Sequence, residues 1–206
     1  MTVLFPPDMI PFWEAEGIAK AADELRQKHF GPTIPVDVDL IAERAFGLDL
    51  VPVNDLKRQV NADAFLSGDL KSICYDPAQP NIRIRFSIAH ELGHRVLHAN
   101  VIERLRTGSF DAWQEMLEEM PGSIWGRAEW QARTFGAQLL VPRAALIQHI
   151  SLLRSKIQAA LELVPNITPQ ELYEYLAPRI SRTFDVSDAV LKARLSEEKI
   201  DIFTLS

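Results

Sequence analysis

Residues 85–94 read RFSIAHELGH and contain His90, Glu91 and His94 in the spacing HExxH. Residues four positions apart lie on one face of a helix, so the two imidazoles can bind the same metal ion, and zinc is the metal typical of this motif. Glu91 is next to this face, where a carboxylate can take a proton from a water molecule. HExxH arises by chance in about one in a hundred chains of this composition, so the surrounding residues must decide whether it marks a metal site.

The surroundings favour a site helix. Apolar residues form a stripe on the face away from the two histidines, namely Ile88, Ala89, Leu92 and Val96. Such a helix can pack against a core while its histidines point elsewhere. The pattern therefore predicts a zinc-binding helix.

Catalytic zinc takes three protein ligands and leaves one position open, so a third ligand should follow on another element. Glu129 is the candidate, because it precedes an apolar stripe of core-type residues, Ala132, Phe135, Gly136, Leu139 and Leu140. A carboxylate in line with such a stripe is costly unless it is paired or binds a metal. The alternative is a solvated glutamate near the start of its helix.

Other metal-ligating residue types fit this site less well. His98 lies four residues after His94, but His90 and His98 are about 12 Å apart along a helix, too far for one ion to take all three histidines. We interpret His98 as a second-shell or surface residue, and Cys74 as a small hydrophobic residue in a strand. The donor that would stabilise an oxyanion is left open among Tyr75, His98, His149 and others.

The remaining sequence predicts an α+β, helix-rich fold in which a small three-stranded sheet packs on the HExxH helix. The expected strands are residues 48–53, 64–67 and 70–75, with Gly68 and Asp69 as a hairpin turn and Pro52 marking an edge strand. The expected helices are residues 11–28, 37–46, 86–99, 111–120, 124–140 with Ser123 as cap, and 143–163.

A helical tail follows, beginning with the capping box Thr168 to Glu171. We expect three parts: residues 1–35 as an N-terminal extension with a helix, residues 36–165 as the main domain, and residues 166–206 as a small helical region. The last region resembles a helix-turn-helix and carries Arg179, Arg182, Lys192 and Arg194. Acidic residues follow closely, so DNA binding by this region is the less favoured alternative, though not excluded.

Composition limits the class of protein. The 206 residues are 47% hydrophobic and carry a formal net charge of -6, which disfavours non-specific binding to nucleic acid or anionic lipid. A single cysteine excludes an intrachain disulfide, and no segment has the length of a membrane span or the pattern of a secretion signal. We therefore expect a cytoplasmic protein with no membrane partner.

Two blocks of the sequence resemble the ImmA/IrrE metallopeptidase family. Residues 85–94 are similar to its RF(S/T)xAHELGH stretch, and residues 129–142 to its ExxANxFAxxLLMP pattern, whose leading glutamate corresponds to Glu129 as third zinc ligand. The resemblance covers about residues 35–142. It implies a gluzincin-like fold and regulated proteolysis of a DNA-binding repressor, often in stress responses, mobile elements or toxin–antitoxin operons.

Three residues depart from the family pattern. Arg133 replaces the usual Asn, Gln131 replaces a frequent Glu, and Gly136 replaces the usual Ala. A cation such as Arg133 cannot accept the N–H of a zinc-bound histidine, so metal affinity or turnover could be weakened.

The resulting prediction is a zinc endopeptidase that hydrolyses a protein substrate, with a helix-turn-helix repressor or antitoxin as candidate partner. Glu91 is the predicted catalytic base, and His90, His94 and Glu129 are the predicted ligands of Zn²⁺. The alternative is a non-proteolytic, zinc-containing regulator that binds a partner protein through the same cleft. Glu91 weighs against it, because a structural metal site needs no base.

Overall fold

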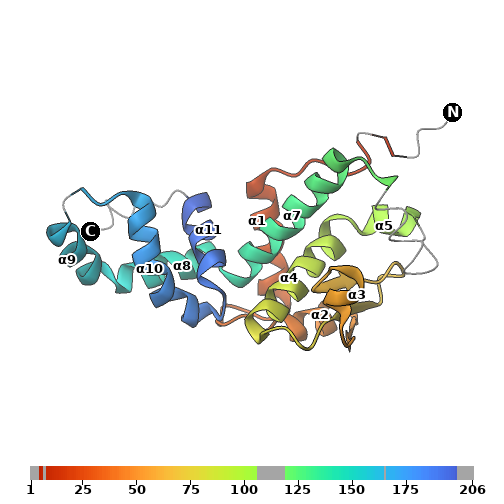
Figure 1. Ribbon diagram of the computed structural model, residues 1–206, viewed down its shortest axis with the longest axis horizontal. Coiled ribbons are helices and arrows are strands. Elements are labelled where there is room, and N and C mark those ends of the chain that lie inside the picture. Colours follow the sequence, from red (N-terminus) through yellow and green to blue (C-terminus); the bar gives the residue numbers. More distant parts are fainter. Residues whose placement is uncertain (1–4, 7, 106–118, 165, 199–206) are drawn as a thin grey trace.

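The computed structural model describes residues 5–6, 8–105, 119–164 and 166–198. Its fold is α+β and helix-rich, with one small sheet and a group of C-terminal helices, as the sequence predicts. Figure 1 shows two lobes, one holding α8 to α11 and the other the sheet and the remaining helices. The helices are α1 (Ala15–His29), α2 (Val38–Phe46), α3 (Leu56–Val60), α4 (Asn81–Leu97), α5 (Ala99–Leu105), α7 (Gly122–Leu140), α8 (Arg143–Leu152), α9 (Arg154–Leu163), α10 (Pro169–Phe184) and α11 (Asp188–Glu198).

The sheet has three strands, β1 (Asp49–Pro52), β2 (Ala64–Leu66) and β3 (Ser72–Tyr75), in the order β1-β3-β2. β1 pairs with β3 in parallel and β2 pairs with it antiparallel, so the predicted hairpin and the predicted edge position of β1 are confirmed. Backbone bonds join Asp63 to Asp76 and Ser67 to Ser72. Hydrogen-bonded and non-hydrogen-bonded residue pairs alternate along an antiparallel ladder, and Ala64 and Leu66 belong to non-hydrogen-bonded pairs. Their N–H and C=O groups therefore point away from β3.

α2 has the termini that its sequence predicts. The side chain of Asp37 accepts a hydrogen bond from the backbone N–H of Leu40 at 3.0 Å, and the helix ends at Gly47 in the left-handed conformation with φ 63°. A residue with a Cβ is strained at this φ, which explains the glycine. α2 packs against β1 and α4 and so ties the sheet to the central helix.

The crossing of α4 and α7 is the centre of the fold and the most extensive contact between helices. A Cβ added to Gly93 of α4 would lie 2.8 Å from the carbonyl oxygen of Ala132 of α7, and one added to Gly136 would lie 3.0 Å from the backbone nitrogen of His90. The two glycines therefore allow the backbones to approach closely. Phe135 and Leu92 fill the core beside them and are fully buried.

α1 packs along α7 and belongs to this core. Ile18 and Ala22 are fully buried in the cluster that also contains the α4 and α7 residues. Two bonds fasten the segment before α1 to α7: Arg127 donates to the carbonyl of Ile10, and Gln131 to that of Pro11. The helix that we expected in an N-terminal extension thus supports the centre of the molecule.

Several helix boundaries differ from the prediction. α4 begins at Asn81 rather than near residue 86, and residues 143–163 form two helices, α8 and α9, separated at Leu153. Ser123 was expected to cap α7, but the helix begins at Gly122 with Pro121 as its N-cap and without a capping side chain. Most of the helix predicted for residues 111–120 lies outside the described residues.

The C-terminal helices α10 and α11 pack against each other, and α11 also contacts α7. The capping box at Thr168 and Glu171 is present as predicted. Arg194 is fully buried, and its guanidinium donates to the carbonyl of Val141 and to Glu198, so this cation is not available to a DNA backbone. Lys192 pairs with Glu174.

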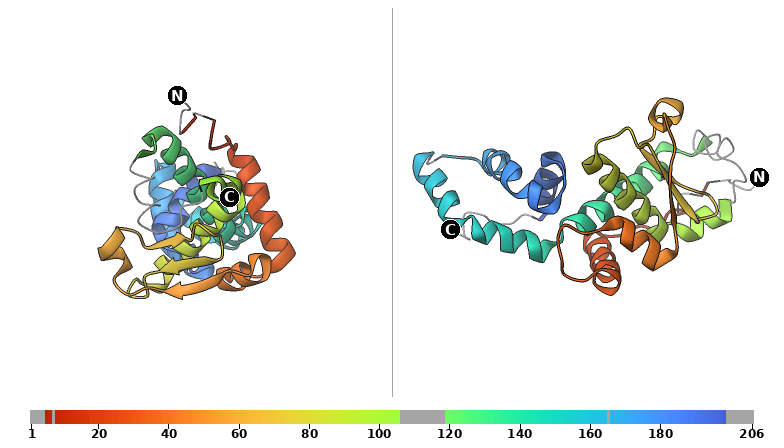
Figure 2. Two further views of the ribbon diagram at one scale, coloured as in Figure 1. Left: turned by 90° about the vertical axis from the view of Figure 1, so that its right-hand side faces the viewer. Right: turned by 90° about the horizontal axis from the view of Figure 1, so that it is seen from below.

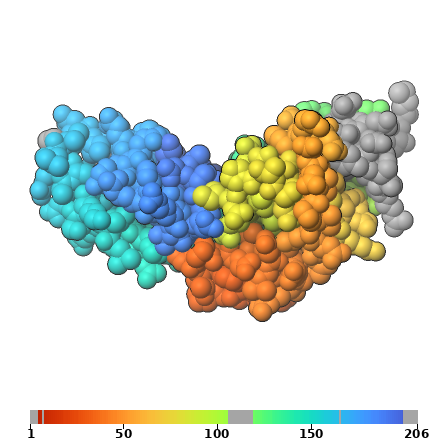
Figure 3. Space-filling view, turned by 60° about the horizontal axis from the view of Figure 1, so that its bottom comes forward, coloured from red at the N-terminus to blue at the C-terminus, as the bar shows by residue number. Residues whose placement is uncertain are grey.

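The two lobes also meet at the first turns of α4. Arg85 forms an ion pair with Asp185 at 3.1 Å and donates to the carbonyl of Val36 at 2.9 Å. In Figure 3 the C-terminal helices, in blue, touch the segment in yellow that contains this part of α4. Figure 2 shows how α8 and α9 lead away from the main lobe before α10 and α11 return to it. Of the helices in the described ranges, none combines the length and the apolar character needed to cross a membrane.

Candidate metal centre

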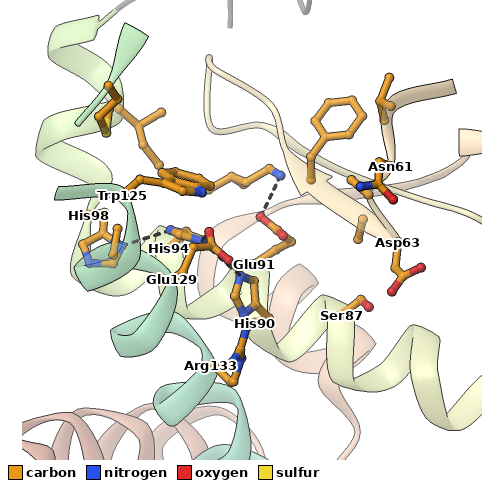
Figure 4. Close-up of a pocket in the computed structure, with 18 of the residues that line it drawn as sticks. Asn61, Asp63, Ser87, His90, Glu91, His94, His98, Trp125, Glu129 and Arg133 are labelled. Atoms are coloured by element: carbon orange, nitrogen blue, oxygen red, sulfur yellow. Dashed lines mark hydrogen bonds and ion pairs between the residues drawn. The ribbon is translucent and has the colours of Figure 1, made fainter. Parts of the chain in front are cut away.

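The two histidines of the HExxH motif lie one turn apart on α4, and α7 brings Glu129 to the same point from a position 35 residues after His94 (Figure 4). The Nε2 atom of His94 is 3.1 Å from the Nε2 atom of His90 and 3.1 Å from Oε1 of Glu129. The Nε2 atom of His90 is 3.4 Å from Oε2 of Glu129. The structure therefore brings together the three residues that the sequence predicts as ligands.

The donor atoms of these residues have the spacing that a tetrahedral ion requires. All three lie within 4.8 Å of one another, and no other such group is found among the residues that the structure describes. Ligands about 2.1 Å from a tetrahedral centre are about 3.4 Å apart. The two imidazole nitrogens are 3.1 Å apart, and each has one oxygen of Glu129 at 3.1 or 3.4 Å. Two imidazoles and one carboxylate form a donor set suited to zinc and to several other transition metals.

Electrostatic effects within the group favour charge separation. Burial disfavours the charged form of Glu129, but hydrogen bonds with His90 and His94 outweigh it and hold the pKa of this carboxyl well below its usual range. Burial likewise opposes the charged form of His90, whereas Glu129 and Glu91 raise the pKa of His90 overall. Glu129 is thus an anion that can bind a cation.

Glu91 lies beside the donor group but does not belong to it. Its side chain is 8% exposed, and its Oε2 accepts a hydrogen bond of 2.9 Å from the backbone N–H of Leu66 on β2. Burial raises the pKa of Glu91, and the nearby histidines only partly offset this effect. A carboxyl group with a raised pKa can exchange a proton with a substrate closer to neutral pH.

His98 and Gln131 form a buried layer behind His94. His98 Nδ1 is 3.0 Å from His94 Nδ1, and His98 Nε2 is 2.8 Å from Oε1 of Gln131. Burial is the main cause that lowers the pKa of His98 to about 4, so this ring is neutral at physiological pH. Of the two interpretations given for His98, a residue behind a metal ligand or a surface residue, its burial excludes the second.

Trp125 was not predicted for this site. Its ring stacks on that of His94, with centroids 5.9 Å apart and an angle of 8° between the planes. Trp125 lies on α7 one turn before Glu129, on the same face of the helix. The only sequence signal for Trp125 was its position four residues before Glu129. This signal became useful only once Glu129 was assigned to the site.

A cleft of about 560 Å³ opens over the donor group. One wall is formed by α3 and β2, from Lys57 to Leu66, and the other by α5 and the first turns of α7. Tyr75 and His149 do not line the cleft, and both ring nitrogens of His98 already have partners. The three named candidates for an oxyanion donor are therefore in unsuitable positions.

Comparison with protein families matches residues 45–196 to the model of Peptidase_M78, described as the IrrE N-terminal-like domain. The match covers most of the chain, including the metal-site helices and α10. The protein belongs to the Peptidase_M78 family. Membership makes it a hydrolase of a metallopeptidase family, in agreement with the resemblance of the two sequence blocks. Comparison with curated proteins gives no match.

Within this Peptidase_M78 site, all three departures from the family pattern have a visible consequence. Arg133 is exposed and lines the cleft near His90, where its charge partly offsets the rise in the pKa of that histidine caused by Glu129 and Glu91 (Figure 4). Gly136 leaves room for the backbone of His90 at the helix crossing. The third, Gln131, accepts the hydrogen bond from His98.

Proposed function

We propose that the protein is a zinc-dependent endopeptidase in which His90, His94 and Glu129 hold Zn²⁺ and Glu91 is the general base. The observation that carries this proposal is the convergence of two imidazole nitrogens, 3.1 Å apart, and one carboxylate whose two oxygens lie 3.1 and 3.4 Å from them, beside a second, buried carboxyl group in a cleft. A structural metal site would need the donors of His90, His94 and Glu129 but not the carboxyl group of Glu91.

Zinc fits the donor set, because two imidazole nitrogens and a carboxylate oxygen leave one tetrahedral position for a small molecule from the cleft. When bound, zinc supplies the Lewis acidity that activates water and polarises a carbonyl group. The protein supplies the arrangement: α4 fixes two donors through its own hydrogen bonds, and the crossing with α7 fixes the third. Because the donors come from two helices, these helices must approach closely where they cross, and Gly93 and Gly136 allow this approach.

Glu91 would take a proton from the attacking water and pass it to the leaving amine. Its raised pKa supports both steps, because the group must accept and then donate near neutral pH. The hydrogen bond from the N–H of Leu66 fixes one carboxylate oxygen and leaves the other for the water. Glu91 is therefore held in one orientation by the neighbouring strand.

The free edge of β2 supports a protein segment in extended conformation as substrate. The C=O and N–H groups of Ala64 and the C=O group of Leu66 point away from β3, and both residues line the cleft. An extended segment can pair with such an edge and place one peptide bond over the donor group. Because walls flank the donor group on both sides, the cleft suits cleavage of a peptide bond within a chain rather than at its end.

The finer form of the proposal is a regulatory protease that cleaves a DNA-binding repressor or antitoxin. Its support is the resemblance of residues 85–94 and 129–142 to the ImmA/IrrE pattern together with the family match. A cytoplasmic location and a role in stress responses or toxin–antitoxin operons stay predictions from the sequence.

Metal analysis combined with Glu91→Gln tests the proposal. Wild-type protein should contain near-stoichiometric zinc and cleave members of a proteome-derived peptide library, read out by mass spectrometry of new termini. Glu91→Gln should keep its zinc and lose about 10²- to 10⁴-fold in cleavage rate. Glu129→Ala should lose the zinc as well. Bound zinc with no cleavage by wild type would instead favour the non-proteolytic regulator. Cleavage that is unaffected by Glu91→Gln would refute the assignment of Glu91 as the general base.

A further inference from the structure

A chain of hydrogen bonds leads from the donor group to the segment before α1. It runs from His94 Nδ1 to His98 Nδ1 at 3.0 Å, from His98 Nε2 to Gln131 Oε1 at 2.8 Å, and from Gln131 Nε2 to the carbonyl of Pro11 at 2.9 Å. His98 is 2% exposed and Gln131 is fully buried. Bulk water therefore does not compete for the two bonds of His98, which are both buried.

The chemistry of the last member fixes the direction of every bond. The carbonyl oxygen of Pro11 can only accept, so the amide nitrogen of Gln131 faces it and the amide oxygen faces His98. That oxygen also can only accept, so Nε2 of His98 carries a hydrogen atom and donates it. In a neutral His98, Nδ1 then has a lone pair and accepts from Nδ1–H of His94.

This direction determines which nitrogen of His94 is free to bind a metal. With its hydrogen atom on Nδ1, neutral His94 has its lone pair on Nε2, the atom 3.1 Å from both His90 Nε2 and Glu129 Oε1. The opposite tautomer would place the lone pair on the far side of the ring. We propose that Pro11, Gln131 and His98 form a relay that holds His94 in the metal-binding tautomer and orientation.

The proposal rests on the proposed function, because it takes His94 Nε2 as a metal ligand. It makes His98 and Gln131 positioning residues, which act through His94 and do not touch substrate. It also gives the N-terminal segment a role at the metal centre through the backbone of Pro11. The relay has no counterpart at His90 among the described residues, where the nearby side chain is the cation Arg133, which cannot accept a hydrogen bond.

Substitution of Gln131 tests the relay through zinc affinity, measured by competition with a chelator. Gln131→Met keeps the length of the side chain but removes the acceptor, and it should weaken zinc binding about 10- to 100-fold. Gln131→Glu keeps an acceptor for His98 Nε2–H and should keep high affinity although it cannot donate to Pro11. Gln138→Met is the matched control: Gln138 lies on the same helix, is 9% exposed and contacts Glu198 rather than the metal centre. It should bind zinc like wild type.

Nitrogen-15 NMR of the histidine rings provides a readout that a merely structural role would not change. In wild type and Gln131→Glu, His98 should carry its hydrogen atom on Nε2, whereas Gln131→Met should give a mixture of tautomers. A hydrogen atom on His98 Nδ1 in wild type, or unchanged zinc affinity in Gln131→Met, would overturn the relay while the proposed function stands. Wild-type protein that binds no zinc would overturn both.

Discussion

The close approach of α4 and α7 can be tested with Gly93→Ala. The added Cβ would lie 2.8 Å from the carbonyl oxygen of Ala132 and 2.9 Å from its Cα, and both atoms belong to the backbone of α7. Neither atom can rotate away as the end of a side chain could. The substitution therefore has to separate the two helices.

The geometry gives the size of the effect. Moving a contact from 2.8 Å to an ordinary separation of about 3.4 Å requires a shift of ~0.6 Å. Overpacking of a core costs about 1–3 kcal/mol, and the better helix propensity of alanine offsets up to about 1 kcal/mol, so we expect a net loss of about 1–2 kcal/mol. The shift also exceeds the ~0.2 Å tolerance of metal–ligand distances, so zinc affinity should fall at least about tenfold.

Gly126→Ala is the matched control, because Gly126 is exposed on α7 and a Cβ there meets nothing within 4 Å. It should stabilise the protein by up to about 1 kcal/mol and leave zinc affinity unchanged. Urea unfolding of the metal-free proteins and chelator competition measure the two quantities separately. If Gly93→Ala stabilised the protein like Gly126→Ala and bound zinc normally, the role of the helix crossing would be refuted.

Three further predictions concern stability. Phe135→Ala should cost about 3–5 kcal/mol in urea unfolding, because the ring is fully buried; a cost below 1 kcal/mol would contradict its place in the core. Asp37→Ala should cost about 1 kcal/mol by loss of the cap on Leu40, whereas Asp37→Asn should cost less; equal losses would argue against capping. Burial opposes the charge of Glu198, but Arg194 and Arg143 outweigh it and lower its pKa in the folded state. The stabilisation is present above the unfolded-state pKa of about 4.3 and is lost as the pH falls through the lower folded-state pKa. Glu198→Gln should therefore make the thermal stability depend less on pH in this acidic range. An unchanged profile would count against the ion pairs.

Local signals predicted those parts of the fold that depend on local physics. Asp37 and Gly47 marked the two ends of α2 because capping and a left-handed C-terminus involve only neighbouring residues. Thr168 and Glu171 did the same for α10. The spacing of His90 and His94 predicted that their rings share a face because the helix alone determines it.

The remaining features depend on contacts between distant segments. Residues 82–85 alternate in polarity and were ambiguous in the sequence, yet they belong to the start of α4, where Arg83 pairs with Asp63 and Arg85 with Asp185. Periodicity also gave no sign of the break between α8 and α9, because no glycine or proline lies there.

The site shows the same limit. Glu129 could be proposed from its place beside an apolar stripe, but Gln131 could not, since its partners His98 and Pro11 come from other parts of the chain. In the sequence, Gln131 was notable only as a departure from a family pattern. Only the three-dimensional arrangement reveals which atom of its amide faces the histidine.

The crossing at Gly93 and Gly136 separates two tasks in this chain. It fixes the donor atoms, whereas large parts of the cleft walls come from α3, β2 and α5, which supply no donor atom. Substitutions in these walls can therefore change which peptide is bound while the reaction centre keeps its geometry. Peptide selectivity can therefore change through these wall residues without a change at the donor atoms.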